Sequence, residues 1–177
     1  MSTVGRRFFG GIVAVVGGLA LAFQFPTAAY AYGDITINAY NFGDDNFRTY
    51  VSTELDTNHD GTLQKSEAEA VTVMDVSGKS IKSLHALDYF PKLTKVYASN
   101  NQVTYINVLD NPDLEVLDVR NNQLTSIDLS KNTKLKKLYI DNNKLGMLDL
   151  TNNGYLEESG QDVSSSNQKK DGDSSCG

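Results

Sequence analysis

The apolar residues between Leu93 and Leu156 return at a fixed spacing of 21 positions. In each unit, apolar residues stand at the first, fourth and sixth positions and an asparagine at the ninth. This L-x-x-L-x-L-x-x-N-x-L pattern is typical of a leucine-rich repeat solenoid. A less regular unit begins at Val71, so we predict four repeats over residues 71–156. One repeat cannot bury its apolar face alone, and a stable stack needs about three.

The alternation within each unit predicts its local structure. An L-x-L core has the period of a β-strand, so its apolar side chains point inward and the residue between them faces outward. Successive strands then align about 4.8 Å apart as a parallel sheet on the concave face of an α+β solenoid. The asparagine after each strand can donate and accept hydrogen bonds, so it can satisfy buried backbone groups of the turn. We predict a buried asparagine ladder formed by Asn101, Asn122 and Asn143.

A different pattern precedes the repeats. The twelve residues from Asp56 to Glu67 read DTNHDGTLQKSE, which fits the spacing of an EF-hand calcium loop. Oxygen-bearing groups recur at alternate positions, as Ca²⁺ requires, and Gly61 permits the sharp turn because it carries no Cβ. The predicted Ca²⁺ ligands are Asp56, Asn58, Asp60, Thr62 through its backbone carbonyl, Gln64 through a water, and Glu67.

The flanks of this loop predict two short helices. An entry helix capped by Asp44 or Asp45 would carry three apolar residues on one face, Phe47, Val51 and Leu55. A short exit helix would end near Ala70. We predict that residues 40–70 form a helix–calcium loop–helix cap on the first repeat. Because the sequence holds no second loop of this kind, we expect modest calcium affinity, roughly 10⁻⁴ to 10⁻³ M.

Residues 1–31 read as a secretory signal peptide. Arg6 and Arg7 precede an apolar run over residues 8–25, and residues 29–31 offer a small-x-small cleavage site. We predict a secreted or extracellular mature chain that begins at Tyr32 and has no membrane span. The alternative is an uncleaved anchor, because an apolar run of 18 residues is near the lower limit for crossing a bilayer.

The repeat pattern fails after Leu156, because Ser159 stands where an apolar residue belongs. Residues 157–177 contain almost nothing to bury, and we predict a disordered polar tail. The sequence does not decide what covers the last repeat. Either Tyr155 and Leu156 fold over that end, or the chain is a shortened relative of a longer protein.

Charge and composition then exclude several classes of function. The chain has 16 basic and 22 acidic residues, and loss of the two leader arginines would change the net charge from −6 to −8. Nucleic acid is therefore a poor partner, since phosphates need clustered Lys and Arg. Cys176 is the single cysteine, so no disulfide can form within the chain. Two histidines without a plausible nucleophile and orienting partner argue against an enzyme.

The outward positions of the predicted strands are the candidate binding surface. They include two tyrosines and an arginine, which are residue types that anchor interfaces. We expect a protein or glycan partner to bind this face, and the sequence leaves the partner's identity and the oligomeric state open. The candidate partner-binding residues are Lys95, Tyr97, Asp118, Arg120, Lys137 and Tyr139.

The stretch from Asn41 to about Tyr155 resembles secreted bacterial leucine-rich repeat proteins of the internalin-like surface class. Their EF-hand-like segment leads straight into repeats, as NFRTYVSTELDTNHDGTLQKSEAEAVTVMDVSGKS leads into LEVLDVRNNQLTSIDLS here. The resemblance implies a right-handed solenoid, a secreted or cell-surface location, and recognition of a protein or glycan. The sequence has few repeats and no LPxTG-type wall-sorting signal. The alternative function is therefore a structural spacer, or a truncated N-terminal fragment of a larger surface adhesin, without a ligand of its own.

Overall fold

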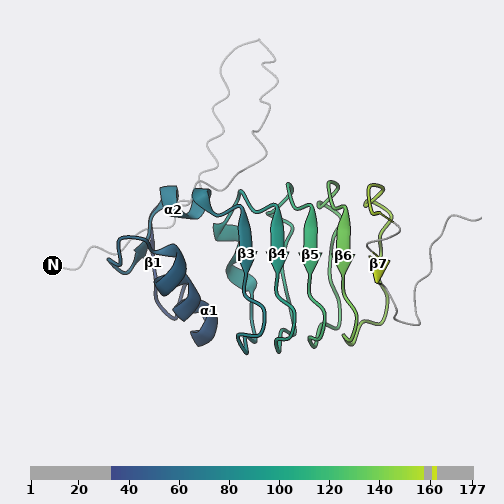
Figure 1. The fold of residues 1–177 in the computed structure, drawn as a ribbon, viewed down its shortest axis with the longest axis horizontal. Helices are drawn as coiled ribbons and strands as arrows, with labels where there is room; N and C mark the ends of the chain where they lie inside the picture. The colour runs from purple at the N-terminus through teal and green to yellow at the C-terminus, as the bar shows by residue number, and fades with distance from the viewer. Residues whose placement is uncertain (1–32, 158–160, 163–177) are drawn as a thin grey trace, which may run out of the picture.

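The repeats form a row of parallel strands, with the helical elements gathered at the N-terminal end (Figure 1). The computed structural model describes residues 33–157 and 161–162, so the predicted signal peptide and most of the predicted tail lie outside it. The elements in chain order are β1 (Ile35–Thr36), α1 (Asp45–Tyr50), η1 (Val51–Leu55), β2 (Thr62–Leu63), α2 (Lys65–Ala70), β3 (Val73–Asp75), η2 (His85–Tyr89), β4 (Lys95–Tyr97), β5 (Val116–Asp118), β6 (Lys137–Tyr139) and β7 (Gln161–Asp162).

The main sheet has the order β3-β4-β5-β6-β7. Its register follows the repeat length, because Val73 pairs with Lys95, Lys95 with Val116, and Val116 with Lys137. The predicted leucine-rich repeat solenoid with a parallel sheet is therefore confirmed. The middle residue of each repeat strand is fully buried, which joins the repeats into one core: Met74, Val96, Leu117 and Leu138.

The sheet extends past the four predicted repeat strands. The backbone of β7, which lies within the predicted tail, pairs in parallel with Leu138 and Tyr139 of β6. Strand pairing satisfies backbone groups and does not require an apolar side-chain pattern, so the repeat periodicity gave no signal for β7.

The C-terminal end of the solenoid is thinly covered. Leu145, Leu150 and Leu156 are only partly buried against the core. Tyr155 is 73% exposed, so it does not fold over the last repeat. Of the two residues considered as a cover, Leu156 alone packs against the core.

The N-terminal end is covered by α1 and η1. Asp44 caps α1 by accepting a hydrogen bond from the backbone N–H of Phe47 at 2.9 Å. The single entry helix that the sequence predicts is in fact a turn of α-helix that continues as the π-helix η1. The wider π-turn alters the helical spacing, so Phe47 and Val51 are buried while Leu55 is only partly buried.

Aromatic rings join this cap to the first repeat. The rings of Phe42 and Phe47 contact Tyr89 and Phe90, respectively, edge to face, with centroids 5.4 and 6.5 Å apart. Such pairs stabilise a core by about 0.5–1.5 kcal/mol beyond their buried area. The first repeat therefore supplies a bulky segment around η2 that the later, more compact repeats lack.

The asparagines at the ninth repeat position each hold two neighbouring turns together. Asn122 donates from Nδ2 to the carbonyls of Ala98 and Val119 at 2.8 and 3.0 Å, and its Oδ1 accepts from the N–H of Val103 at 2.9 Å. Asn101 and Asn143 repeat this arrangement. Asn101 and Asn122 are buried, whereas Asn143 is only partly buried because it lies in the last repeat.

A second asparagine ladder, which was not predicted from the sequence, lies in the return segments. Asn132 donates from Nδ2 to the carbonyls of Val108 and Asn111 at 2.8 and 2.9 Å. Its counterparts Asn111 and Asn153 stand 21 residues before and after it, and all three are buried. This spacing was the signal that could have revealed the ladder.

We expect Asn122→Ala to destabilise the protein by about 1–3 kcal/mol, because backbone groups of two repeats would lose their buried partner. Urea unfolding followed by circular dichroism would measure the loss. Thr125→Ala, at an exposed position of the same repeat, is the control and should change stability by less than about 0.5 kcal/mol. Equal stabilities for the two variants would contradict this role of the ladder.

Candidate functional site

The predicted calcium loop connects η1 to α2 and turns sharply at its centre. His59 and Gly61 have positive φ values of 56° and 80°. Glycine adopts this conformation without the steric penalty of a side chain, which is the role predicted for Gly61. The turn brings the first half of the loop back over Asp56, whose side chain is 1% exposed.

The first three predicted acidic or amide ligands converge on this turn. Asp56 accepts hydrogen bonds from the N–H groups of Asp60 and Gly61 at 3.3 and 2.9 Å. Asn58 Oδ1 accepts from the N–H of Asp60 at 3.1 Å. The Gln64 side chain donates to Asp60 Oδ2 at 2.8 Å. Four of the predicted ligand residues are thus directly linked by hydrogen bonds.

Glu67 reaches back from α2 to both halves of the loop. Its Oε1 accepts from the N–H and hydroxyl of Thr57 at 2.7 and 2.6 Å, and its Oε2 accepts from the N–H of Gln64 at 2.9 Å. Burial by itself would raise the pKa of Glu67, but the hydrogen bonds from Thr57 and Gln64 together outweigh it, and the pKa is lowered. The carboxylate is therefore ionised at neutral pH.

The remaining predicted ligand, Thr62, lies in β2, which pairs antiparallel with β1. The N–H of Ile37 donates to the carbonyl of Gly61 at 2.9 Å. Because hydrogen-bonded pairs alternate along an antiparallel ladder, the backbone groups of Thr62 face away from β1. This partner strand was not predicted, since two residues carry no recognisable periodicity.

Within the described part of the chain, no three His, Cys, Asp or Glu side chains form a metal-binding cluster. The loop instead offers a mixed set of carboxylate, amide and backbone oxygens. Such oxygens are the ligands that calcium takes, and they are poor ligands for softer metals.

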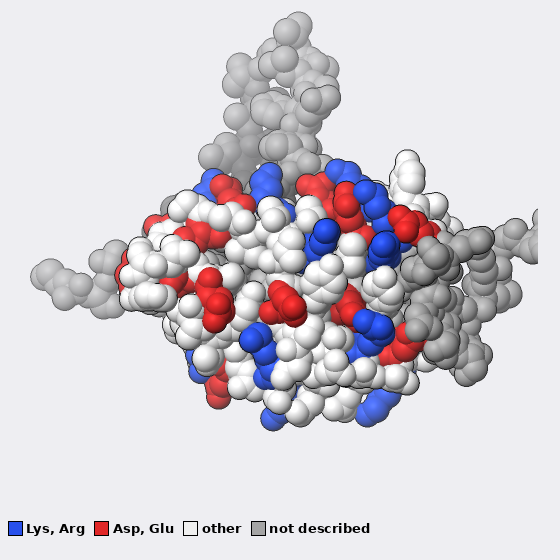
Figure 2. All heavy atoms as spheres, in the orientation of Figure 1, with Lys and Arg blue, Asp and Glu red and all other residues white. Residues whose placement is uncertain are grey.

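The sheet brings the six concave candidates together in rows. Tyr97, Asp118 and Tyr139 are register partners on β4, β5 and β6. The prediction of Asp118 as an outward contact residue is wrong, because its side chain is only 8% exposed and is bonded to Arg120. Lys95 and Lys137 lie on a neighbouring row, with Val116 between them. Figure 2, in the orientation of Figure 1, shows acidic and basic side chains interspersed on the face toward the viewer.

Arg120 is fixed against two of its neighbours. Its Nε and Nη2 donate to the two carboxylate oxygens of Asp118 at 3.0 and 2.7 Å, and its guanidinium lies 4.9 Å from the ring centroid of Tyr139. The hydrogen bonds to Asp118 raise the pKa of Arg120. With 41% of its side chain exposed, Arg120 is held in one orientation while it still faces solvent.

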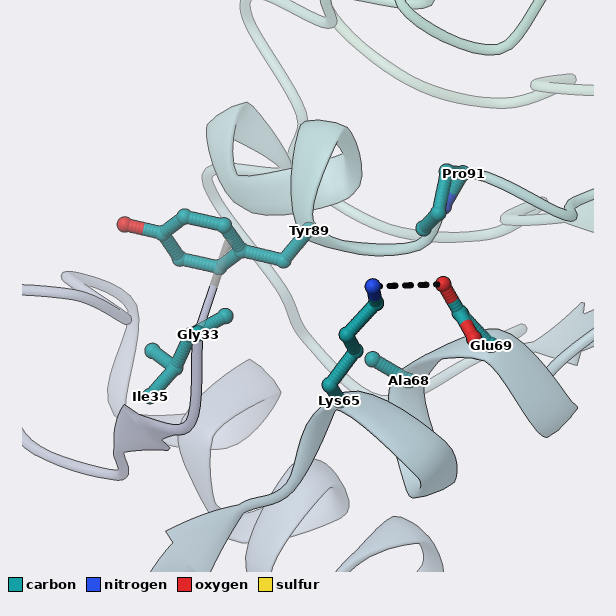
Figure 3. A pocket seen from close by; sticks show the side chains of 7 residues that line it. All are labelled: Gly33, Ile35, Lys65, Ala68, Glu69, Tyr89 and Pro91. Atoms are coloured by element: carbon teal, nitrogen blue, oxygen red, sulfur yellow. Dashed lines mark ion pairs between the residues drawn. The ribbon is translucent and has the colours of Figure 1, made fainter. Parts of the chain in front are cut away.

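A small pocket beside β1 carries no site (Figure 3). It encloses about 20 Å³, which is room for about one water molecule. The ion pair drawn there joins Lys65 to Glu69 at 3.7 Å. The lining residues are Gly33, Ile35, Lys65, Ala68, Glu69, Tyr89 and Pro91.

Comparison with known proteins indicates the class of protein to which this chain is similar. The family description "Leucine Rich repeats (2 copies)" matches residues 112–157. No curated protein is similar to the chain in sequence. The fold is similar to that of an internalin (inlF) from Listeria monocytogenes, with a TM-score of 0.60 and 21% identity over 72% of this chain and 45% of that one.

A second solved structure gives the same result. The functional domain of InlJ from Listeria monocytogenes, whose description includes a cysteine ladder, has a TM-score of 0.51 and 22% identity over 73% of this chain and 33% of its own. The chain thus contains leucine-rich repeats and shares the internalin-like fold, and it spans less than half the length of these two proteins. Nothing in the comparisons or the described residues points to catalysis.

The helices in the described part of the chain are too short to cross a lipid bilayer.

The lowered pKa of Glu67 predicts an acid-sensitive contribution to stability in calcium-free buffer. This contribution is present above the ordinary glutamate pKa of about 4.3 and is lost as pH falls through the lower folded-state value. Glu67→Gln should therefore lose less stability than the wild type below about pH 4.3. Urea unfolding across this pH range would measure the difference.

Glu69→Gln is the matched control for that experiment, because Glu69 lies on the same helix with an exposed side chain. It should follow the wild-type pH dependence. Identical slopes for Glu67→Gln and the wild type would contradict the assignment.

Proposed function

We propose that the chain is a secreted or cell-surface binding module that recognises a protein or glycan partner through its concave face. A structural calcium ion bound by residues 56–67 would stabilise the N-terminal end of this module. The observation that carries the proposal is the fixed Arg120, which is held by Asp118 and Tyr139 on the exposed face of the sheet.

The concave face has the chemistry that such recognition needs. Tyr97 and Tyr139 offer aromatic surface with little conformational entropy to lose, and Asp118 and Arg120 already have their orientation. A protein interface would use the tyrosines and Arg120 as anchors. A glycan would stack on the tyrosine rings and exchange hydrogen bonds with the polar groups between them.

The calcium site is supported by the arrangement of the loop. Asp56 and Asp60 already place carboxylates around the turn, and the backbone carbonyl of Thr62 faces away from β1. Asn58, Gln64 and Glu67 would complete the set. Bound calcium would link the end of η1 to the start of α2, and so would fix the cap on the first repeat.

A spacer within a larger surface adhesin is the second candidate function. One observation favours it: the two internalin structures match this chain over only 33% and 45% of their own lengths. A spacer would need the stiffness of the solenoid but no ligand on the concave face.

Calcium at about 10 mM should stabilise the protein by about 1–3 kcal/mol, if the affinity is that of an extracellular module. Thermal unfolding and titration calorimetry with and without chelator would measure the effect. Asp60→Asn should abolish most of it, whereas Glu69→Gln should retain it. No heat of binding and no shift in melting temperature would contradict the calcium site.

Binding to protein and glycan arrays would test the concave face. The double variant Tyr97→Ala with Tyr139→Ala should bind an array-identified ligand at least about tenfold more weakly, because two anchoring rings are lost. Thr125→Ala, which is exposed outside the sheet, is the control and should bind as the wild type does. Unchanged affinity in the double variant would contradict the assignment, and no ligand on either array would favour the spacer.

A further inference from the structure

The edge strand β3 borders an open groove at the junction of the cap and the first repeat. The groove encloses about 550 Å³, which is within the range of sites that bind ligands. Its lining comes from η1, the calcium loop, α2 and β3, and it includes Glu54, Leu55, Glu67, Ala70, Val71 and Val73. The groove is distinct from the row of tyrosines on β4 and β6.

The backbone of β3 offers unused hydrogen-bonding groups toward this groove. In the parallel ladder, the carbonyl of Thr72 and the N–H of Val76 pair with the β4 strand segment. Because successive residues alternate in direction, the N–H and carbonyl of Val73 face away from β4. Neither group bonds to another backbone or side-chain group among residues 33–157 and 161–162.

The free edge is short and has a defined end. β3 ends at Asp75, two residues beyond Val73. The side chain of Val73 is 48% exposed. Val73 thus combines two open backbone groups with an exposed apolar side chain, which are the features that a pairing strand uses.

The charged residues of the groove indicate the chemistry of its partner. The groove is lined by Glu54 and Glu67 and by no lysine or arginine. The carboxylate of Glu67 accepts hydrogen bonds from Thr57 and Gln64, so Glu54 supplies the negative charge that a partner would meet. The protein as a whole has a net charge of −6. A basic segment is therefore favoured here over an acidic one, and the apolar positions of Leu55, Val71 and Val73 favour apolar residues between its charges.

We propose that this groove binds an extended peptide segment of a partner protein, with alternating basic and β-branched residues, which adds to β3 as an edge strand. The peptide backbone would exchange two hydrogen bonds with Val73. A basic side chain would lie against Glu54, which is not among the proposed calcium ligands. This docking site goes beyond the concave face and requires no ligand to be bound there.

The capped peptide TKVKVKT is a direct probe of this site. Titrated into the ¹⁵N-labelled protein with calcium present, it should shift the amide resonance of Val73 more than those of β5 and β6. Val73→Pro removes the outward N–H at an edge position that tolerates proline, and it should weaken binding by about tenfold. Val73→Ala keeps the N–H and is the matched control, with a smaller loss.

Two further measurements separate strand addition from other kinds of binding. A peptide N-methylated at its central residues should bind the wild-type protein about tenfold more weakly, which keeps the test valid even if Val73→Pro fails to fold. Glu54→Gln should weaken binding several-fold at low salt. The proposal is overturned if the probe does not bind at about 1 mM, if N-methylation leaves affinity unchanged, or if the double variant Tyr97→Ala with Tyr139→Ala abolishes binding.

Discussion

The fold depends on how each turn satisfies its buried backbone groups. A solenoid of short strands has little regular hydrogen bonding of its own, so its turns would leave carbonyls and N–H groups without partners. The amides of Asn101, Asn122 and Asn143 supply those partners across adjacent repeats. Asn111, Asn132 and Asn153 do the same for carbonyls in the return segments. Each repeat is thereby tied to its neighbour on both sides of the core.

This double attachment has a consequence for the concave face. Because the strands are held at a fixed register, equivalent side chains of successive repeats lie side by side on neighbouring strands. Arg120 can then bond to Asp118 and lie over Tyr139 of the next strand. The proposed binding surface would lose little conformational entropy on binding a partner, since its central charged group is already positioned.

The two ends of the solenoid differ in how their core residues are covered. At the N-terminal end, aromatic contacts between Phe47 and Phe90 seal the core, and β1 pairs with β2 of the loop. The edge of β3 is nonetheless left partly open beside a groove. At the C-terminal end, Tyr155 is exposed and the last leucines are only partly buried. The cap therefore concentrates both the polar loop and the accessible strand edge at one end of the molecule.

The sequence by itself determined the repeat register, the strand positions and the residues of the first asparagine ladder. These features follow from a periodic pattern, and in a solenoid each repeat contacts mainly its neighbours, so local spacing specifies the packing. The same spacing contained the second ladder at Asn132. Only the tertiary structure decided the pairing of β1 with the loop, the addition of β7, the contact of Arg120 with Tyr139, and the open edge at Val73. Those features join segments that share no period, and their backbone groups pair without a side-chain signature, so no pattern along the chain could have indicated them.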